Sequence, residues 1–151
     1  MINFKLNEKE VSVEAHENAS LLSVLTEKLH MAGVKYGCGK SQCGACMVMV
    51  DVDKVISCAT PAKSVSGRSV TTLEGLLENG KPNALQQAFI EEQAAQCGYC
   101  TSGMIITAQT ILDNNPNPTD AEIRAGMNGN LCRCGTQNRV VKAILRAAKE
   151  L

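Results

Sequence analysis

The chain has few of the large aromatic side chains on which small domains usually build their cores. Its 151 residues include no Trp, two Tyr and two Phe, and aromatic residues make up 3% of the sequence. At this length the chain can form one domain or two small ones, and each half then buries only a modest core. Domains of that size often depend on a bound metal or a cross-link for stability. The scarcity of aromatics therefore suggests that a bound metal or a cross-link helps to stabilise each half.

The chain also has no excess of charge of either sign. Fifteen Lys and Arg residues balance fifteen Asp and Glu residues, and the formal net charge at pH 7 is zero. Proteins that bind nucleic acid or anionic membrane surfaces concentrate positive charge in runs or patches. The balance argues against both kinds of partner.

A secretion signal, a membrane span and a catalytic constellation are missing too. Residues 1–5 carry no apolar signal core and no twin arginine, and no stretch approaches the length of a bilayer span. No Ser/His/Asp set or phosphate-binding glycine loop is visible, so we predict no catalytic residues. We predict a cytoplasmic chain without direct membrane insertion, exported only if a partner carries the signal. Cytosolic cysteines stay reduced, which favours metal binding over disulfides.

Eight cysteines, in two groups of four, are the most informative feature that is present. The first group opens with C-x4-C-x2-C, the spacing that wraps three thiolates around a plant-type [2Fe–2S] cluster. Glycines at 37, 39 and 44 allow positive φ and bring backbone N–H groups close to the sulfurs. The alternative is a mobile loop of scattered thiols. The predicted ligands are Cys38, Cys43, Cys46 and Cys58.

The second group consists of two close pairs that come from separate segments, C-x2-C and C-x-C. In a helical half the first pair would end one helix and precede another, and the second pair would precede the last helix. Two helix N-termini, with their dipoles and free N–H groups, would then oppose the negative charge of a cluster. This spacing fits a second [2Fe–2S] cluster, and it also fits a four-cysteine zinc site. A disulfide pair is disfavoured by the compartment. The residues are Cys97, Cys100, Cys132 and Cys134.

The sequence pattern changes near residue 79, which predicts an α+β chain of two domains. Residues 1–78 indicate a hairpin, a helix from Ser20 to Gly33 and then short strands, which together suggest a β-grasp domain with the cysteine loop at its edge. An Asn-Gly-Lys-Pro linker follows. Residues 79–151 indicate a four-helix bundle. Its helices are predicted at about 84–96, at 102–112, after Thr119 and from Thr136 or Asn138.

Four motifs in matching order resemble the small iron–sulfur subunit of the xanthine dehydrogenase family, the molybdenum hydroxylases. The resemblance covers essentially the whole chain. It implies a ferredoxin-like β-grasp domain followed by a four-helix domain, each with one [2Fe–2S] cluster, and it makes zinc a remote alternative. The motifs are Gly37-Cys38-Gly39, Cys43-Gly44-Ala45-Cys46, Gln96-Cys97-Gly98-Tyr99-Cys100 and Asn130-Leu131-Cys132-Arg133-Cys134-Gly135.

The resemblance also implies a role and partners. Electrons would run from a molybdopterin centre in a large partner subunit, through the cluster of the helical domain and then that of the β-grasp domain, to an acceptor. Gln96 would contact the pterin and the sulfur of Cys134 would lie against its amino group, while the partner holds the cofactor. The chain looks most like the small subunits of nicotinate, isoquinoline and aldehyde dehydrogenases. A flavin subunit or a cytochrome c would then accept the electrons.

Three departures from the family pattern leave every predicted ligand in place. Residues 40–42 replace a more glycine-rich stretch, Ser102 stands where proline is common, and residues 137–139 differ from the commonest ending. The main alternative function is a freestanding soluble ferredoxin, although such shuttles usually carry a strong charge bias for steered docking. A structural zinc protein that acts as an interaction module is the third.

Overall fold

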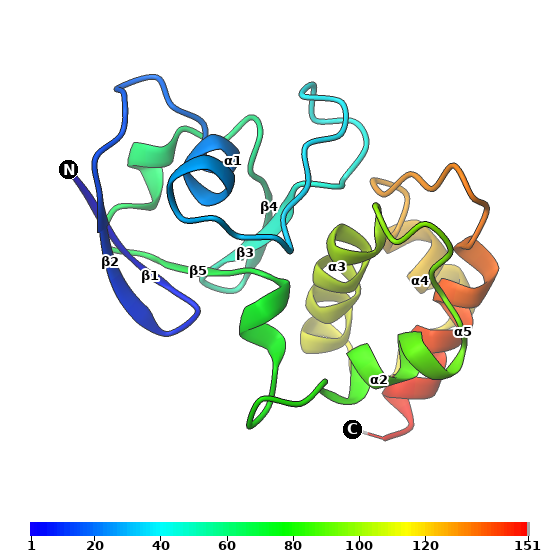
Figure 1. The fold of residues 1–151 in the computed structure, drawn as a ribbon. Coiled ribbons are helices and arrows are strands. Elements are labelled where there is room, and N and C mark those ends of the chain that lie inside the picture. Colours follow the sequence, from blue (N-terminus) through cyan, green and yellow to red (C-terminus); the bar gives the residue numbers. More distant parts are fainter. Residues whose placement is uncertain (151) are drawn as a thin grey trace.

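The computed structural model describes residues 1–150, and a sheet-based part and a helical part lie side by side in it (Figure 1). The strands are β1 (Ile2–Leu6), β2 (Lys9–Val13), β3 (Met47–Val50), β4 (Asp53–Ile56) and β5 (Ser69–Thr71). They form one five-stranded sheet in the order β2-β1-β5-β3-β4. β1 and β5 run parallel, and the other neighbours are antiparallel. This is the predicted β-grasp arrangement.

The predicted N-terminal hairpin is confirmed, and its alternation explains its register. Ile2, Phe4 and Leu6 are buried, while the residues between them face solvent. The turn places Asn7 at a φ of 49°, and the Asn7 side chain accepts a hydrogen bond from the backbone N–H of Thr72 at 2.9 Å. The turn is therefore fixed to the chain that leaves β5.

The helix after Ser20 begins where the sequence predicts and ends earlier. Ser20 Oγ accepts a hydrogen bond from the backbone N–H of Ser23 at 3.1 Å and caps α1 (Leu21–Ser23), which continues as a π-helical turn, η1 (Val24–Lys28). The predicted end at Gly33 is wrong. His30 takes a φ of 54°, in the left-handed region that stops a helix, so the chain leaves toward the cysteine loop.

The helical part contains α2 (Ala84–Glu91), α3 (Thr101–Asn114), α4 (Asp120–Gly126) and α5 (Gln137–Ala148). Asn83 and Thr119 each form a capping box with the residue three positions on, as the sequence predicts for Thr119. Two 3-10 turns, η2 (Ala62–Val65) and η3 (Leu73–Leu76), belong to the connections of the first part. The predicted α+β class is confirmed.

The prediction that α2 runs to about Gln96 is wrong. Gln93 has a φ of 50° and donates its N–H to the Ile90 carbonyl, while Ala94 donates to the Phe89 carbonyl at 2.9 Å. These two bonds form a Schellman motif, which normally uses glycine at the position of Gln93. Residues 95–99 are consequently an exposed loop rather than a helix.

The two parts have separate hydrophobic cores, and a small third cluster joins them. Phe4, Leu25 and Val48 belong to the core of the sheet-based part. Ile106 of α3 packs against Met47 and Met49 of β3, across the junction. Between residues 1 and 150, no helix has the length and apolar character required to cross a bilayer. The domain boundary at residue 79 stays a prediction.

Candidate metal centres

In the first cysteine group, a loop of backbone N–H groups surrounds the Cys38 sulfur. Cys38 Sγ accepts hydrogen bonds from the N–H groups of Lys40 and Gln42, each at 3.3 Å, and of Cys43 at 3.4 Å. These bonds lower the pKa of the Cys38 thiol to about 6. The thiolate is the form that binds metal. The loop therefore presents a ligand that is already ionised at neutral pH.

Glycine is required where the loop passes the second sulfur. A Cβ on Gly37 would lie 2.6 Å from Cys43 Sγ, so that position accommodates no larger residue without a shift. The N–H of Cys38 also donates to Cys43 Sγ at 3.3 Å. Burial raises the pKa of the Cys46 thiol, and the Cys58 thiol is close enough to act on it as well. The four thiols thus lie as two pairs, Cys38 with Cys43 and Cys46 with Cys58.

The second group is assembled from the start of α3 and the loop before α5. Cys100 is the N-cap of α3 and its thiol contacts that of Cys132; burial is the largest cause that raises the pKa of Cys100 to about 12. Burial also acts on Cys132, but hydrogen bonds to Thr136 and to Cys100 outweigh it and lower the pKa of Cys132 to about 7. Thr136 Oγ1 lies 3.2 Å from Cys132 Sγ.

Of the four cysteines of the second group, Cys97 is the most exposed and the other three are half-buried. Cys97 is exposed in the 95–99 loop, and Gln96 beside it is exposed as well. Cys134 is half-buried, three residues before α5 begins. The predicted position of Cys97 at the end of a helix is wrong, because α2 stops at Glu91. The predicted position of Cys100 directly before a helix is confirmed.

The pairwise arrangement bears on which metal group the thiols fit. A zinc site needs four donors around one ion, whereas a [2Fe–2S] cluster divides its cysteines between two irons. Thiols that influence one another's pKa in pairs, one pair beside a ring of backbone N–H donors, fit the iron–sulfur cluster.

The two cysteine groups are in direct contact through their loops (Figure 1). The N–H of Leu131 donates to the carbonyl of Cys43 at 2.9 Å, and the side-chain amide of Asn130 donates to the carbonyl of Gly44 at 3.3 Å. A Cβ on Gly103 of α3 would lie 2.1 Å from the Gly44 oxygen. Glycine at position 103 therefore lets α3 approach the cysteine loop backbone to backbone, and glycine at position 44 does the same for the loop at Gly129, whose oxygen would lie 2.4 Å from a Cβ on Gly44.

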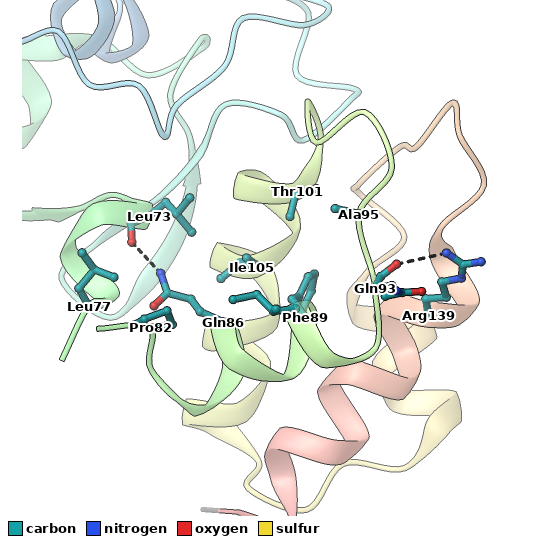
Figure 2. Close-up of a pocket in the computed structure, with 11 residues that line it drawn as sticks. Leu73, Leu77, Pro82, Gln86, Phe89, Gln93, Ala95, Thr101, Ile105 and Arg139 are labelled. Atoms are coloured by element: carbon teal, nitrogen blue, oxygen red, sulfur yellow. Dashed lines mark hydrogen bonds between the residues drawn. The ribbon is translucent and has the colours of Figure 1, made fainter. Parts of the chain in front are cut away.

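The groove of about 600 Å³ in Figure 2 lies beside these sites rather than within them. Phe89 and Ile105 line it, and Gln86 Nε2 donates to the Leu73 carbonyl at 3.1 Å along its wall. None of its lining residues is Cys, His, Asp or Glu. The groove is an apolar surface feature that borders the 95–99 loop through Ala95.

Several contacts that build the site do not follow from the sequence. Asn130 and Leu131 stand in a motif whose evident feature is its cysteines, and their bonds to the first loop are invisible in the sequence. Thr136 is predicted only as a helix start, and it also contacts Cys132. The motif that contains Tyr99 predicts no role for this residue. Its position between two cysteines is the available signal.

Comparisons with known proteins agree with this geometry. A 2Fe-2S iron-sulfur cluster binding domain matches residues 4–79. A [2Fe-2S] binding domain matches residues 72–145. Each matched segment contains one of the two cysteine groups.

Relatives of similar length resemble the whole chain. The nicotinate dehydrogenase small FeS subunit of Eubacterium barkeri is 45% identical over 148 residues, which cover 98% of this chain and 94% of the relative. The alpha subunit of isoquinoline 1-oxidoreductase from Brevundimonas diminuta is 50% identical over 151 residues, 99% of each. A chain of quinoline 2-oxidoreductase from Pseudomonas putida 86 superposes with a TM-score of 0.95 at 38% identity, over 98% of this chain and 93% of that one. The protein therefore belongs to the small, non-catalytic iron–sulfur subunits of the xanthine dehydrogenase family, the molybdenum hydroxylases, and its cofactors are two [2Fe–2S] clusters.

Proposed function

We propose that the chain conducts electrons from a molybdopterin centre in a large partner subunit to an acceptor, through the helical site first and the β-grasp site second. The hydrogen bond from the Leu131 N–H to the Cys43 carbonyl carries this proposal. Leu131 is bonded covalently to Cys132, so bonds run without a gap from one cysteine group to the other. When bound, a [2Fe–2S] cluster supplies a centre that is reduced and reoxidised. The chain itself makes and breaks no substrate bond.

The proposed ligands are all eight cysteines. The ring of N–H groups around Cys38, and the bond from the Cys38 N–H to Cys43 Sγ, support the first set. The contact between Cys100 and Cys132 supports the second. The sets are Cys38, Cys43, Cys46 and Cys58 in residues 1–78, and Cys97, Cys100, Cys132 and Cys134 in residues 79–151, which we propose as the two domains.

The large partner is proposed to cover the loop at residues 95–99. Both Gln96 and Cys97 are exposed there, and an iron ligand left at the surface would open its cluster to oxygen. Leu77 and Ile90, on the rim of the neighbouring groove, are 45% and 60% exposed, and such adjoining apolar surface is typical of interfaces. Gln96 would contact the pterin and Cys134 would bring its sulfur to the pterin amino group. The partner holds the molybdopterin cofactor.

The proposed substrate is an N-heteroaromatic compound resembling nicotinate or isoquinoline, or an aldehyde, oxidised in a pocket of the partner. The names of the relatives support the class, since they belong to a nicotinate dehydrogenase and to an isoquinoline oxidoreductase. The acceptor is a flavin subunit or a cytochrome c. We place the complex in the cytoplasm, where the free thiols stay reduced until the clusters are inserted.

Co-expression of the chain with its large subunit tests this function. The purified complex is mixed anaerobically with nicotinate, isoquinoline or an aldehyde, and the visible absorbance of the clusters is followed. Bleaching by one substrate class is expected, and a complex without molybdenum should bleach only with dithionite. A chain that purifies alone with iron, and that unrelated reductases reduce, would instead indicate a freestanding ferredoxin.

A further inference from the structure

A tyrosine hydroxyl joins the two cysteine loops at a second place. Tyr99 lies between Cys97 and Cys100, and its hydroxyl donates a hydrogen bond to the main-chain carbonyl of Tyr36. Tyr36 stands two residues before Cys38 and 63 positions from Tyr99. The bond therefore connects the start of the first cysteine loop to the loop that carries the first ligand of the second group.

Glycines close to Tyr99 and Tyr36 shape the backbone on both sides of this bond. Gly98 has a φ of +82°, a conformation that glycine adopts without strain and that directly precedes Tyr99. The ring of Tyr36 folds back over its own loop, since a Cβ on Gly39 would lie 2.7 Å from the Tyr36 hydroxyl oxygen. The Tyr36 side chain thus packs against its own loop, and the Tyr36 carbonyl accepts the bond from the helical part.

The contacts between the loops fasten the first cysteine loop at two separate points. Leu131 and Asn130 bind its middle, at Cys43 and Gly44. Tyr99 binds its start. A second point of attachment restricts the rotation that a single point would allow. Removal of the Tyr99 bond would therefore leave the route through Leu131 intact and free the Cys38 end of the loop.

We propose that Tyr99 is a positioning residue whose hydroxyl fixes the distance and orientation between the two [2Fe–2S] sites. This inference rests on the proposed function. Tyr99 acts by holding the loops in position and not as part of the electron path, because the path through Leu131 and Cys43 contains fewer bonds. A neutral hydrogen bond of ordinary strength changes the equilibrium constant between the bonded and the released loop by roughly fivefold.

The test compares Tyr99→Phe with Tyr36→Phe in the iron-loaded full-length chain. Tyr36→Phe is the matched control, since it also removes one exposed phenol hydroxyl but leaves the main-chain acceptor in place. Two readouts are used: the magnetic splitting between the two dithionite-reduced clusters in the EPR spectrum, and amide exchange in residues 33–46. We expect Tyr99→Phe to weaken or broaden the splitting and to speed exchange in that segment about fivefold. The control should match wild type in both readouts.

Three results would overturn the inference. Unchanged splitting and exchange in Tyr99→Phe would show that the hydroxyl positions nothing. Equal changes in both variants would assign the effect to the loss of any phenol group near the loop. A wild-type chain without two iron–sulfur signals would contradict the proposed function itself, and the inference with it.

Discussion

One loop presents three of the four cysteines of the first group, whereas the second group is assembled from segments separated by residues 101–131. In the first, short-range backbone hydrogen bonds lower the pKa of Cys38 to about 6. In the second, burial raises the pKa of Cys100 to about 12, although at Cys132 burial is outweighed by hydrogen bonds to Thr136 and Cys100, which lower that pKa to about 7. The first site is organised by local backbone geometry and the second by the packing of helices. The β-grasp site should therefore depend on its loop, and the helical site on the fold around it.

The largest expected effect comes from removing one cysteine from each site. Cys43→Ser and Cys132→Ser should each lower the iron content from about four to about two atoms per chain, because each removes one ligand of one cluster. Cys132→Ser should also lower the Tm more than Cys43→Ser does, because its site ties distant segments together. Iron analysis with calorimetry measures both effects. Equal losses of Tm would contradict the contrast between a local and an assembled site.

The next effect concerns the contact between the sites. Gly103→Ala places a Cβ 2.1 Å from the Gly44 oxygen, so either α3 or the cysteine loop must move. Alanine favours helix by up to about 1 kcal/mol over glycine, but overpacking costs about 1–3 kcal/mol, and the clash here is with backbone. We expect a lower free energy of unfolding by denaturant titration.

Gly129→Ala is the matched control for that variant. A Cβ at this position meets nothing within 4 Å, and the residue lies in the same contact region. It should leave the unfolding midpoint within experimental error of wild type. A stable Gly103→Ala variant would show that α3 and the cysteine loop do not need this close approach.

Smaller effects are expected at the helix caps, one in each part. Ser20 caps α1 and Asn83 caps α2, each through a side-chain oxygen that accepts a backbone N–H. Replacement by Ala should cost about 1 kcal/mol in either case. Hydrogen exchange should locate the loss in the sheet-based part for Ser20→Ala and in the helical part for Asn83→Ala. Loss spread evenly over both parts would mean that they unfold as one unit.

The smallest effect is expected at the surface of the helical part. Arg146 of α5 forms ion pairs with Glu91 at 2.6 Å and Glu92 at 2.8 Å, and its side chain is 45% exposed. Exposed pairs of this kind contribute about 0–1 kcal/mol. Arg146→Ala should lower the Tm slightly at low salt and not measurably at high salt. A large loss that salt does not reduce would indicate a packing role for this side chain.

Local signals are sufficient to predict the hairpin and the helix caps, and the spacing of the cysteines is read directly from the sequence. Ile2, Phe4 and Leu6 alternate with polar residues, as a strand with one buried face requires, and Thr119 precedes Glu122 at the spacing of a capping box. The loop that holds Cys38 carries its own glycines. In each case the residues that form the structure are neighbours in the chain.

Helix ends and contacts between the parts cannot be predicted in the same way. The end of α2 has no glycine to mark it in the sequence. Gln93 adopts the left-handed conformation there that glycine usually supplies. His30 does the same after η1. The bond between Leu131 and Cys43 joins residues far apart in the chain, so it depends on how the two parts pack. The 3-10 turn η2 also has no strong signal.

Iron and zinc analysis of the natively purified chain, combined with EPR after dithionite reduction, distinguishes two iron–sulfur clusters from a zinc site. We expect about four irons per chain, negligible zinc and two distinct [2Fe–2S] signals. Zinc in place of iron, or a single iron–sulfur signal with about two irons, would contradict the assignment of one cluster to each cysteine group.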